Sequence, residues 1–409
     1  MVEQGGLQPL ITLAYAHDPD VHQQAAAALR GLSVSAENKM KVVQEGGLEP
    51  LTRLLASEDV EILREVCAAL NNLSLGDENK FEIAKCGAVP PLITHCQSDD
   101  MIIAAQSCAC LANLAEMEEN QEIIAREGGV RPTIAVMRSR YVEVQREAGR
   151  LLANLCASDS ETSDLILFDS GAVAALMPLA TSDDLETRRC VSFALNNVAS
   201  NEKNHRVLER MGVLRPLVTL LRDKDQDTHL QACLAVRQLS LTPKCRFQFV
   251  EMKGLQPLLA LADSDSIEVQ RELAAALRNL SLSEANKISI VRHNGMDVLI
   301  KFAHSLDVEI AHQSCGVLAN LAESLENQGP MIETGLLQHL KFVLRSKSVD
   351  VQREAVRAIA NLSAEYSHTA AIVAAGALLP LVPTLSSPDF LCQRYAAMGV
   401  ANLATNMGN

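Results

Sequence analysis

A short motif recurs along this chain at an almost constant interval of 41 residues. It is a glycine followed by small or apolar residues and often a proline, as in Gly5-Gly6-Leu7-Gln8-Pro9-Leu10. The motif starts near residues 5, 46, 87, 128, 171, 212, 253, 294, 335 and 376. Regular periods of about 20–50 residues are typical of repeat proteins, in which each unit packs only on its neighbours. We therefore predict one array of about ten repeats over residues 1–409.

Each repeat divides into three predicted helices. Glycine tolerates the left-handed conformation that ends a helix, so the first helix ends just before the motif, as at 35–45 before Gly46. The second helix opens near the motif's proline, a column that holds seven of the chain's 14 prolines. After a polar turn, the third helix runs to a marker 26 residues beyond the motif's start. Because aromatic residues make up only 3% of the chain and tryptophan is absent, an all-α fold is favoured over sheets.

The marker is asparagine in eight repeats and is followed by leucine or valine. Two positions before it stands an apolar residue, and five before it a small one, which is the spacing of a buried seam on one helix face. Four cysteines occupy the small position, and we expect them to be packing residues without a redox role: Cys67, Cys108, Cys233 and Cys315.

A longer period indicates an internal duplication. The segment at 106–114 returns at 313–321, and that at 144–148 returns at 351–355, in both cases 207 residues later. Repeats 1–5 therefore look like a duplicate of repeats 6–10, and a feature of one half should recur in the other.

The combined pattern, Gly-Gly/Ala-x-x-Pro-Leu, a polar turn and Ala-Leu-x-Asn-Leu-Ser, resembles the armadillo repeat over the whole chain. The sequence resembles the fungal vacuolar armadillo adaptor and β-catenin most, and importin-α less, because the groove of importin-α carries a tryptophan that this chain lacks. The resemblance implies a right-handed superhelical solenoid whose third helices line a concave groove. In this family the groove binds extended or helical segments of partner proteins.

Three columns of the third helix should face that groove: the asparagine and the positions four and eight before it. These 30 positions hold eight arginines and no acidic residue. Arginine binds carboxylate or phosphate with paired donors, and asparagine both donates to and accepts from a peptide bond. Our candidate partner-binding residues are Arg64, Asn72, Asn113, Arg146, Arg150, Asn154, Arg189, Phe193, Asn197, Arg271, Asn279, His312, Asn320, Arg353, Arg357, Asn361, Arg394, Met398 and Asn402.

A purely structural role is the alternative for both residue types. An acid precedes several of these arginines by three residues, as in Glu61–Arg64, so the column could be a self-paired helix face. The asparagines could bridge the backbone between repeats. We expect spare positive charge in two clusters, Arg146–Arg150–Arg189 and Arg353–Arg357–Arg394, and the duplication predicts that both bind the same kind of segment.

Other classes of function lack a signal in the sequence. A net charge of −14 gives no overall attraction to nucleic acid or anionic lipid, and no apolar run is long enough to span a membrane. No phosphate loop, dinucleotide fingerprint or hydrolase motif occurs, and the ten histidines show no metal-ligand spacing. We expect no catalytic residue, metal or cofactor. Eleven scattered cysteines suggest free thiols in a reducing compartment, which favours a cytoplasmic protein, with access to the nucleus left open.

The sequence therefore predicts a non-enzymatic scaffold or adaptor that binds acidic or phosphorylated segments of other proteins. Two alternatives remain: a structural segment of a filament or axonemal array, and the regulatory array of an enzyme whose catalytic domain lies outside this chain. The last repeat ends in an uncovered apolar stretch, Ala396–Ala401, whereas solenoids need polar ends. We accordingly expect a fragment of a longer array or end-to-end self-association.

Overall fold

The computed structural model describes residues 2–157 and 171–405, and every regular element in that part of the chain is a helix. The contacts divide the chain into two compact units, Met1–Pro216 and Leu217–Asn409. Each unit holds about five of the ten predicted repeats. The all-α solenoid class is thereby confirmed, and the two units are described separately below.

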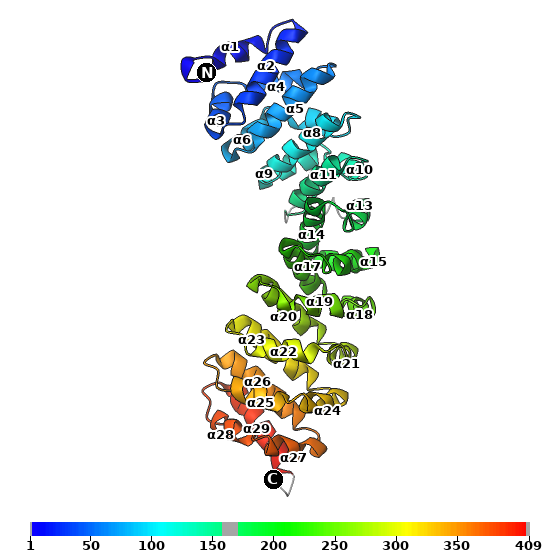
Figure 1. The fold of residues 1–409 in the computed structure, drawn as a ribbon, viewed down its shortest axis with the longest axis vertical. Helices are drawn as coiled ribbons and strands as arrows, with labels where there is room; N and C mark the ends of the chain where they lie inside the picture. The colour runs from blue at the N-terminus through cyan, green and yellow to red at the C-terminus, as the bar shows by residue number, and fades with distance from the viewer. Residues whose placement is uncertain (1, 158–170, 406–409) are drawn as a thin grey trace. The chain divides into compact units, whose positions relative to one another are not determined.

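The third helices are the longest elements and stack on one another in chain order within each unit (Figure 1). In the first unit they are α2 (Pro19–Leu32), α5 (Val60–Ser74), α8 (Met101–Leu114), α11 (Val142–Leu155) and α14 (Leu185–Ser200). In the second unit they are α17 (Gln226–Leu239), α20 (Ile267–Leu280), α23 (Val308–Leu321), α26 (Val349–Leu362) and α29 (Phe390–Ala404).

The second helices are short and pack against the third helices of their own repeats. They are α1 (Leu7–Leu13), α4 (Leu48–Leu54), α7 (Val89–His95), α10 (Val130–Val136), α13 (Gly171–Leu179), α16 (Leu214–Leu220), α19 (Leu255–Ala260) with η3 (Leu261–Asp263), α22 (Gly295–Ala303), α25 (Leu336–Val343) and α28 (Leu378–Thr384).

The first helices precede the glycine column as predicted. They are α3 (Ala36–Gln44), α6 (Asp77–Lys85), α9 (Glu118–Arg126), η2 (Glu202–Asn204) with α15 (His205–Met211), α18 (Pro243–Glu251), α21 (Glu284–Arg292), α24 (Leu325–Glu333) and α27 (Tyr366–Ala374). The first helix expected before Gly171 falls in 158–170, outside the described residues. A single turn, η1 (Val2–Gln4), precedes α1.

The glycine column marks a left-handed backbone position at the junction of first and second helices. Gly46, for example, has a φ of 86°. Two repeats lack the glycine, and their Lys253 and Asn294 nevertheless adopt φ values of 58° and 61°. The junction geometry is therefore imposed by the packing of the repeat, because side chains other than glycine are strained in this region.

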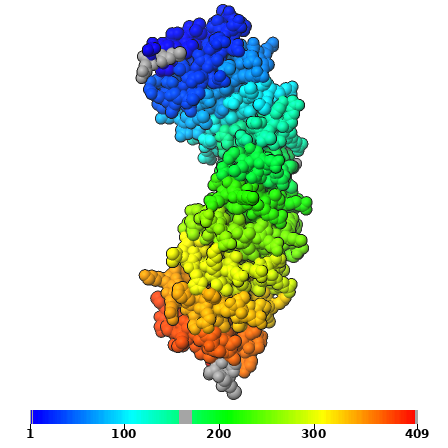
Figure 2. Space-filling view, viewed as in Figure 1, coloured from blue at the N-terminus to red at the C-terminus, as the bar shows by residue number. Residues whose placement is uncertain are grey.

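The core of each unit runs between successive repeats, where small residues let the third helices approach closely. Cys67, Cys108, Cys233 and Cys315 are all fully buried, which confirms the predicted packing role. All eleven cysteines are free thiols. Within each unit the colours of the space-filling view follow the chain, so successive repeats lie next to one another (Figure 2).

Candidate functional site

The asparagine column forms a ladder of hydrogen bonds between repeats. All eight side chains donate from Nδ2 to the end of the preceding third helix, where carbonyl groups lack partners within the helix. Asn154 donates to the carbonyl of Ala112 at 2.8 Å, and Asn197 to that of Ala153 at 2.9 Å. Four more donate to backbone carbonyls: Asn72 to Arg30, Asn279 to Arg237, Asn361 to Ala319 and Asn402 to Ala360. The last two donate to hydroxyls: Asn113 to Ser74 and Asn320 to Ser281. The bridging role considered for this column is thus present throughout it.

Two of these asparagines are buried and fully engaged. Asn113 and Asn320 are 1% and 5% exposed, and their Oδ1 atoms accept from Arg150 Nη1 at 2.7 Å and Arg357 Nη2 at 2.6 Å. The remaining six are half-buried, and their Oδ1 atoms have no partner in the described part of the chain: Asn72, Asn154, Asn197, Asn279, Asn361 and Asn402. The bond through Nδ2 holds each of these six side chains in place, so each presents a fixed acceptor.

The arginines eight positions before the asparagine pair across repeats with aspartates. Arg146 donates from Nη2 and Nε to the two carboxylate oxygens of Asp184, at 2.6 and 3.0 Å. Asp184 also caps α14 by accepting from the backbone N–H of Thr187. Arg353 binds both carboxylate oxygens of Asp389 in the same way. Arg64 and Arg271 also pair across repeats, but each donates from Nε and Nη2 to one oxygen, Oδ2 of Asp100 and of Asp307 respectively. One carboxylate thus caps a helix and ties it to the preceding repeat.

These pairs change the acidity of the aspartates. Hydrogen bonding from Arg146 lowers the pKa of Asp184 from 3.8 to about 2, with further lowering by the cap bonds from Thr187. Arg64, Arg271 and Arg353 likewise lower the pKa values of Asp100, Asp307 and Asp389. The carboxylates are therefore ionised down to low pH, and the arginines keep their partners.

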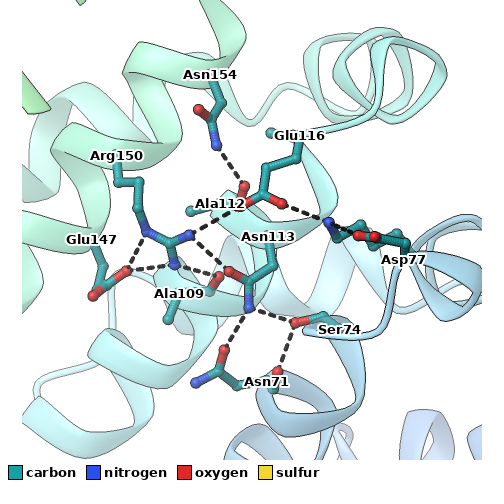
Figure 3. A network of polar contacts seen from close by, with 12 residues as sticks. Asn71, Ser74, Asp77, Ala109, Ala112, Asn113, Glu116, Glu147, Arg150 and Asn154 are labelled. Carbon is teal, nitrogen blue, oxygen red and sulfur yellow. Dashed lines mark hydrogen bonds and ion pairs between the residues drawn. The ribbon is translucent and has the colours of Figure 1, made fainter. Parts of the chain in front are cut away.

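The arginines four positions before the asparagine organise a second network, shown in Figure 3. Arg150 donates to Oε2 of Glu147 from Nε at 3.0 Å and from Nη2 at 2.8 Å, and also to the carbonyl of Ala109 at 3.2 Å. Arg357 in the second unit donates to the carbonyl of Gly316 at 3.1 Å and pairs with Glu354 Oε2 at 3.0 Å. Each arginine thus connects its own helix to the preceding one.

Of the eight candidate arginines, Arg394 has no ion-pair partner within 2–157 and 171–405, and its side chain is exposed. Arg189 pairs with Glu186 at 2.8 Å. Each of the other six pairs with a carboxylate as described above. Phe193 and Met398 are each 37% exposed, which leaves an apolar surface beside each cluster. His312 lies 3.9 Å from Glu354 Oε1, at the edge of the second-unit network.

The two clusters differ in charge balance. The first-unit arginines, Arg146, Arg150 and Arg189, contact four carboxylates, Glu116, Glu147, Asp184 and Glu186, of which Glu116 also pairs with Lys80. In the second unit Arg353, Arg357 and Arg278 share three carboxylates, Asp350, Glu354 and Asp389, and Arg394 has no ion pair among the described residues. Within the described residues all three arginines of the first cluster are therefore paired, whereas the second cluster keeps one arginine, Arg394, without an ion pair.

Comparison with known proteins identifies the repeats. A family model described as armadillo/β-catenin-like repeat matches residues 1–34, 35–75, 76–116, 117–157, 242–282, 283–323 and 326–364. The chain belongs to the armadillo/β-catenin-like repeat family. An engineered protein solved by the Northeast Structural Genomics Consortium is similar over 97% of this chain and 98% of its own, with 31% identity and a TM-score of 0.83. A second engineered protein covers 57% of this chain with 96% of its own, at 30% identity and a TM-score of 0.55. None of the curated proteins matches the chain in sequence.

The armadillo repeats of the two units share their polar contacts at an offset of 207 residues. Lys80 pairs with Glu116 at 2.5 Å, and Lys287 with Glu323 at 2.9 Å. The bonds that Arg150 makes to Ala109 and Asn113 recur in those that Arg357 makes to Gly316 and Asn320. These recurrences fit the duplication inferred from the sequence, which remains an interpretation.

The cross-repeat aspartates were not among the residues singled out from the armadillo sequence, although a signal exists. Arg64 stands eight residues before the asparagine of its repeat, and the N-cap of the next third helix is Asp100. Ala105 stands at the same position one repeat later, and the N-cap that follows it is Tyr141, which carries no charge. The same holds for Arg271 with Asp307. Comparing columns between adjacent armadillo repeats, rather than within one helix, would have revealed the pairing.

Neither a metal site nor a membrane span is evident in the described armadillo repeats. Over 2–157 and 171–405, no group of three or more His, Cys, Asp or Glu could hold a metal ion. No single helix there is long and apolar enough to cross a membrane, and α27 with α28 reaches that length only as a pair bent by 95°.

Proposed function

We propose that this armadillo chain is a scaffold or adaptor that binds linear segments of partner proteins along its third helices, in a reducing compartment such as the cytoplasm. The observation that carries the proposal is the set of six half-buried asparagines with a bonded Nδ2 and an unpartnered Oδ1. Such an anchored oxygen accepts from a backbone N–H of any sequence. Armadillo repeats in general serve as protein-interaction scaffolds, which agrees with this assignment.

For the second unit we propose an acidic or phosphorylated segment as the ligand. Arg394 on α29 is exposed and has no carboxylate within the described residues, and the apolar Met398 follows it by one helical turn. An arginine that is not already paired offers all of its donors to a carboxylate or phosphate. The cluster around it has more arginines than carboxylates, which favours an anionic partner.

The test is binding of the purified chain to an array of peptides with and without phosphorylated residues. We expect acidic or phosphorylated peptides to bind, and Arg394→Glu to weaken them by about tenfold, because a charge-assisted hydrogen bond contributes about 1.5–3 kcal/mol. Arg345→Glu is the matched control: Arg345 is also exposed and unpaired in the described chain, but it follows the second helix α25.

Two outcomes would contradict the proposal. Equal loss of binding in Arg394→Glu and Arg345→Glu would indicate a general charge effect. If no peptide bound at all, the face formed by the third helices would not be a binding site for linear segments. Replacing Arg146, Arg150, Arg353 or Arg357 is a poorer test, because each of these side chains bonds to a residue of a neighbouring repeat.

A further inference from the structure

A pocket of about 620 Å³ lies between the second helices of the last two repeats, α25 and α28, which Figure 1 labels. Its walls are residues of these two helices and of the turns that follow them, with one residue of α26. Small-molecule sites in proteins typically have volumes of about 300–1,000 Å³. The pocket is therefore large enough for a small ligand, and most of its wall lies outside the third helices.

One exchange in a repeated position gives the pocket its first charge. The residue six positions after the helix junction is aliphatic and buried in five other second helices: Ile11, Ile93, Ile134, Val218 and Leu259. In α25 this residue is Lys341. Its Nζ donates to the carbonyl of Ala375, the C-cap of α27, at 2.8 Å, and to Oε1 of Gln338 at 3.1 Å. An ammonium group thus stands where these other repeats place an aliphatic contact.

The pocket as a whole is positively charged. Lys341 and Arg345 both line it, and none of its lining residues in the described part of the chain is acidic. The side chain of Arg345 is exposed and has no hydrogen bond or ion pair within 2–157 and 171–405. The two oxygens bonded to Lys341 are neutral, so its charge is not compensated there. Two uncompensated cations in a concave site attract an anion.

The rest of the wall provides a hydroxyl group and an aliphatic surface. Ser386 lines the pocket, is exposed and has no side-chain hydrogen bond among the described residues, so its hydroxyl can donate to a ligand. Leu344 and Leu379 also line it and are 8% and 79% exposed. The described lining has no aromatic ring on which a nucleotide base could stack. These groups suit a ligand with an anionic end and an aliphatic end.

We propose that this pocket binds a small free molecule with a phosphate monoester at one end and an aliphatic portion at the other. A phosphate monoester carries nearly two negative charges at neutral pH and has three strong acceptor oxygens, which match the two cations and the hydroxyl of Ser386. The aliphatic portion packs on Leu344 and Leu379. The site does not include Arg394 or the asparagine column, so the inference goes beyond the proposed binding of linear segments and does not depend on it.

The experiment measures binding of octyl phosphate to the full chain by isothermal titration, with inorganic phosphate and 1-octanol as the two halves of the ligand. We expect octyl phosphate to bind at least about tenfold more tightly than either half, because a charge-assisted hydrogen bond and apolar burial both contribute. If inorganic phosphate or 1-octanol bound as tightly as octyl phosphate, or if octyl phosphate did not bind, the inference would be wrong.

Two variants locate the site. Arg345→Glu should weaken octyl phosphate binding by at least about tenfold, whereas Lys347→Glu, the same change at an exposed residue outside the lining, should leave it unchanged. Lys341→Ile introduces the residue found at this position in α1, α7 and α10, so the fold and melting temperature should be kept while binding is lost. Equal effects of Arg345→Glu and Lys347→Glu, or full binding by Lys341→Ile, would contradict the inference.

A phosphate monoester could also be presented by a lipid. Vesicles of phosphatidylcholine with phosphatidic acid test this source by co-sedimentation, and we expect none, because a net charge of −14 opposes approach to an anionic surface. Co-sedimentation that Arg345→Glu abolished would overturn the assignment to a free molecule. Peptide binding on the array should be unaffected by Arg345→Glu, so failure of the pocket and failure of the proposed function are distinguishable.

Discussion

Arg278 and Glu354 form an ion pair of 2.6 Å although they lie 76 residues apart, in third helices separated by a whole repeat. Glu354 is 9% exposed and also pairs with Arg357 at 3.0 Å, and Arg357 in turn donates to the carbonyl of Gly316 on the helix between them. Repeat proteins are held together chiefly by contacts between adjacent units. This pair is a contact beyond the nearest neighbour, and it should make the second unit unfold more cooperatively.

Arg278→Met should therefore lower the stability of the second unit. Methionine retains the aliphatic stem but leaves the nearly buried carboxylate of Glu354 with one partner fewer, which costs about 1.5–3 kcal/mol. The measurement is urea-induced unfolding followed by circular dichroism. Arg292→Met is the control, because Arg292 and its partner Glu326 are 70% and 55% exposed, and exposed pairs contribute about 0–1 kcal/mol. Equal effects of the two substitutions would show that the long-range pair adds nothing special.

Asp184→Ser should reduce stability at neutral pH, and the reduction should disappear in acid. Serine keeps a cap of the kind that Ser266 and Ser348 provide, but it loses the pair with Arg146. The pKa of Asp184 is lowered to about 2 in the folded chain, so its contribution is complete above the unfolded value of 3.8 and is lost as pH falls towards 2.

The check on this prediction is the difference in urea midpoint between the original chain and Asp184→Ser, at pH 7, 4 and 2.5. The difference should be constant from pH 7 to about pH 4.5 and shrink below that. A difference that stayed the same at pH 2.5 would mean that the carboxylate acts through its shape or cap alone.

The register of the repeats could be read from the sequence because one residue type marks each junction. Seven glycines of the column adopt positive φ at the predicted junctions, and the asparagines lie in the last turn of their third helices. The two residues that replace glycine in this column, Lys253 and Asn294, adopt the same left-handed backbone conformation. A backbone conformation that favours one residue type depends on a single position, so it can be recognised directly in the sequence.

Contacts between repeats were harder to foresee. The acid three residues before Arg64 is visible within one helix, but Asp100 lies 36 residues away and meets Arg64 only when two helices stack in the correct register. The charge of the groove depends on those pairings, so counting arginines in three columns overestimated the free positive charge of the first cluster. Arg278 lies outside these columns, and its reach across Gly316 follows from packing alone.

Lys253→Gly should stabilise the chain. Lys253 has a φ of 58°, a conformation that costs a residue with a Cβ atom on the order of 1 kcal/mol and that glycine adopts freely. Asn294→Gly is the matched control, because Asn294 has almost the same φ of 61° but asparagine tolerates this region. Thermal unfolding should show a higher midpoint for the first variant and little change for the second. Equal shifts would indicate that the strain at Lys253 is relieved by its surroundings.

The thiols of the folded chain should differ sharply in reactivity. Nine of the eleven cysteines are buried, and only Cys86 and Cys190 are half-buried. Burial raises the pKa of Cys190 to about 12, so its reactive thiolate is scarce at pH 8. Cys86 lies at the end of α6, where its Sγ is 3.1 Å from the hydroxyl of Thr52.

We therefore expect one fast thiol, Cys86, when the native chain is treated with N-ethylmaleimide at pH 8 and the products are mapped by mass spectrometry. The other ten should react only as the repeats open, because the thiolate is the nucleophile and must reach solvent. Cys86→Ser should remove the fast phase, and Cys190→Ser, which removes the other half-buried thiol, should leave it unchanged. Fast labelling of Cys108 or Cys315 in the native chain would contradict the packing described above, since both side chains are fully buried between third helices.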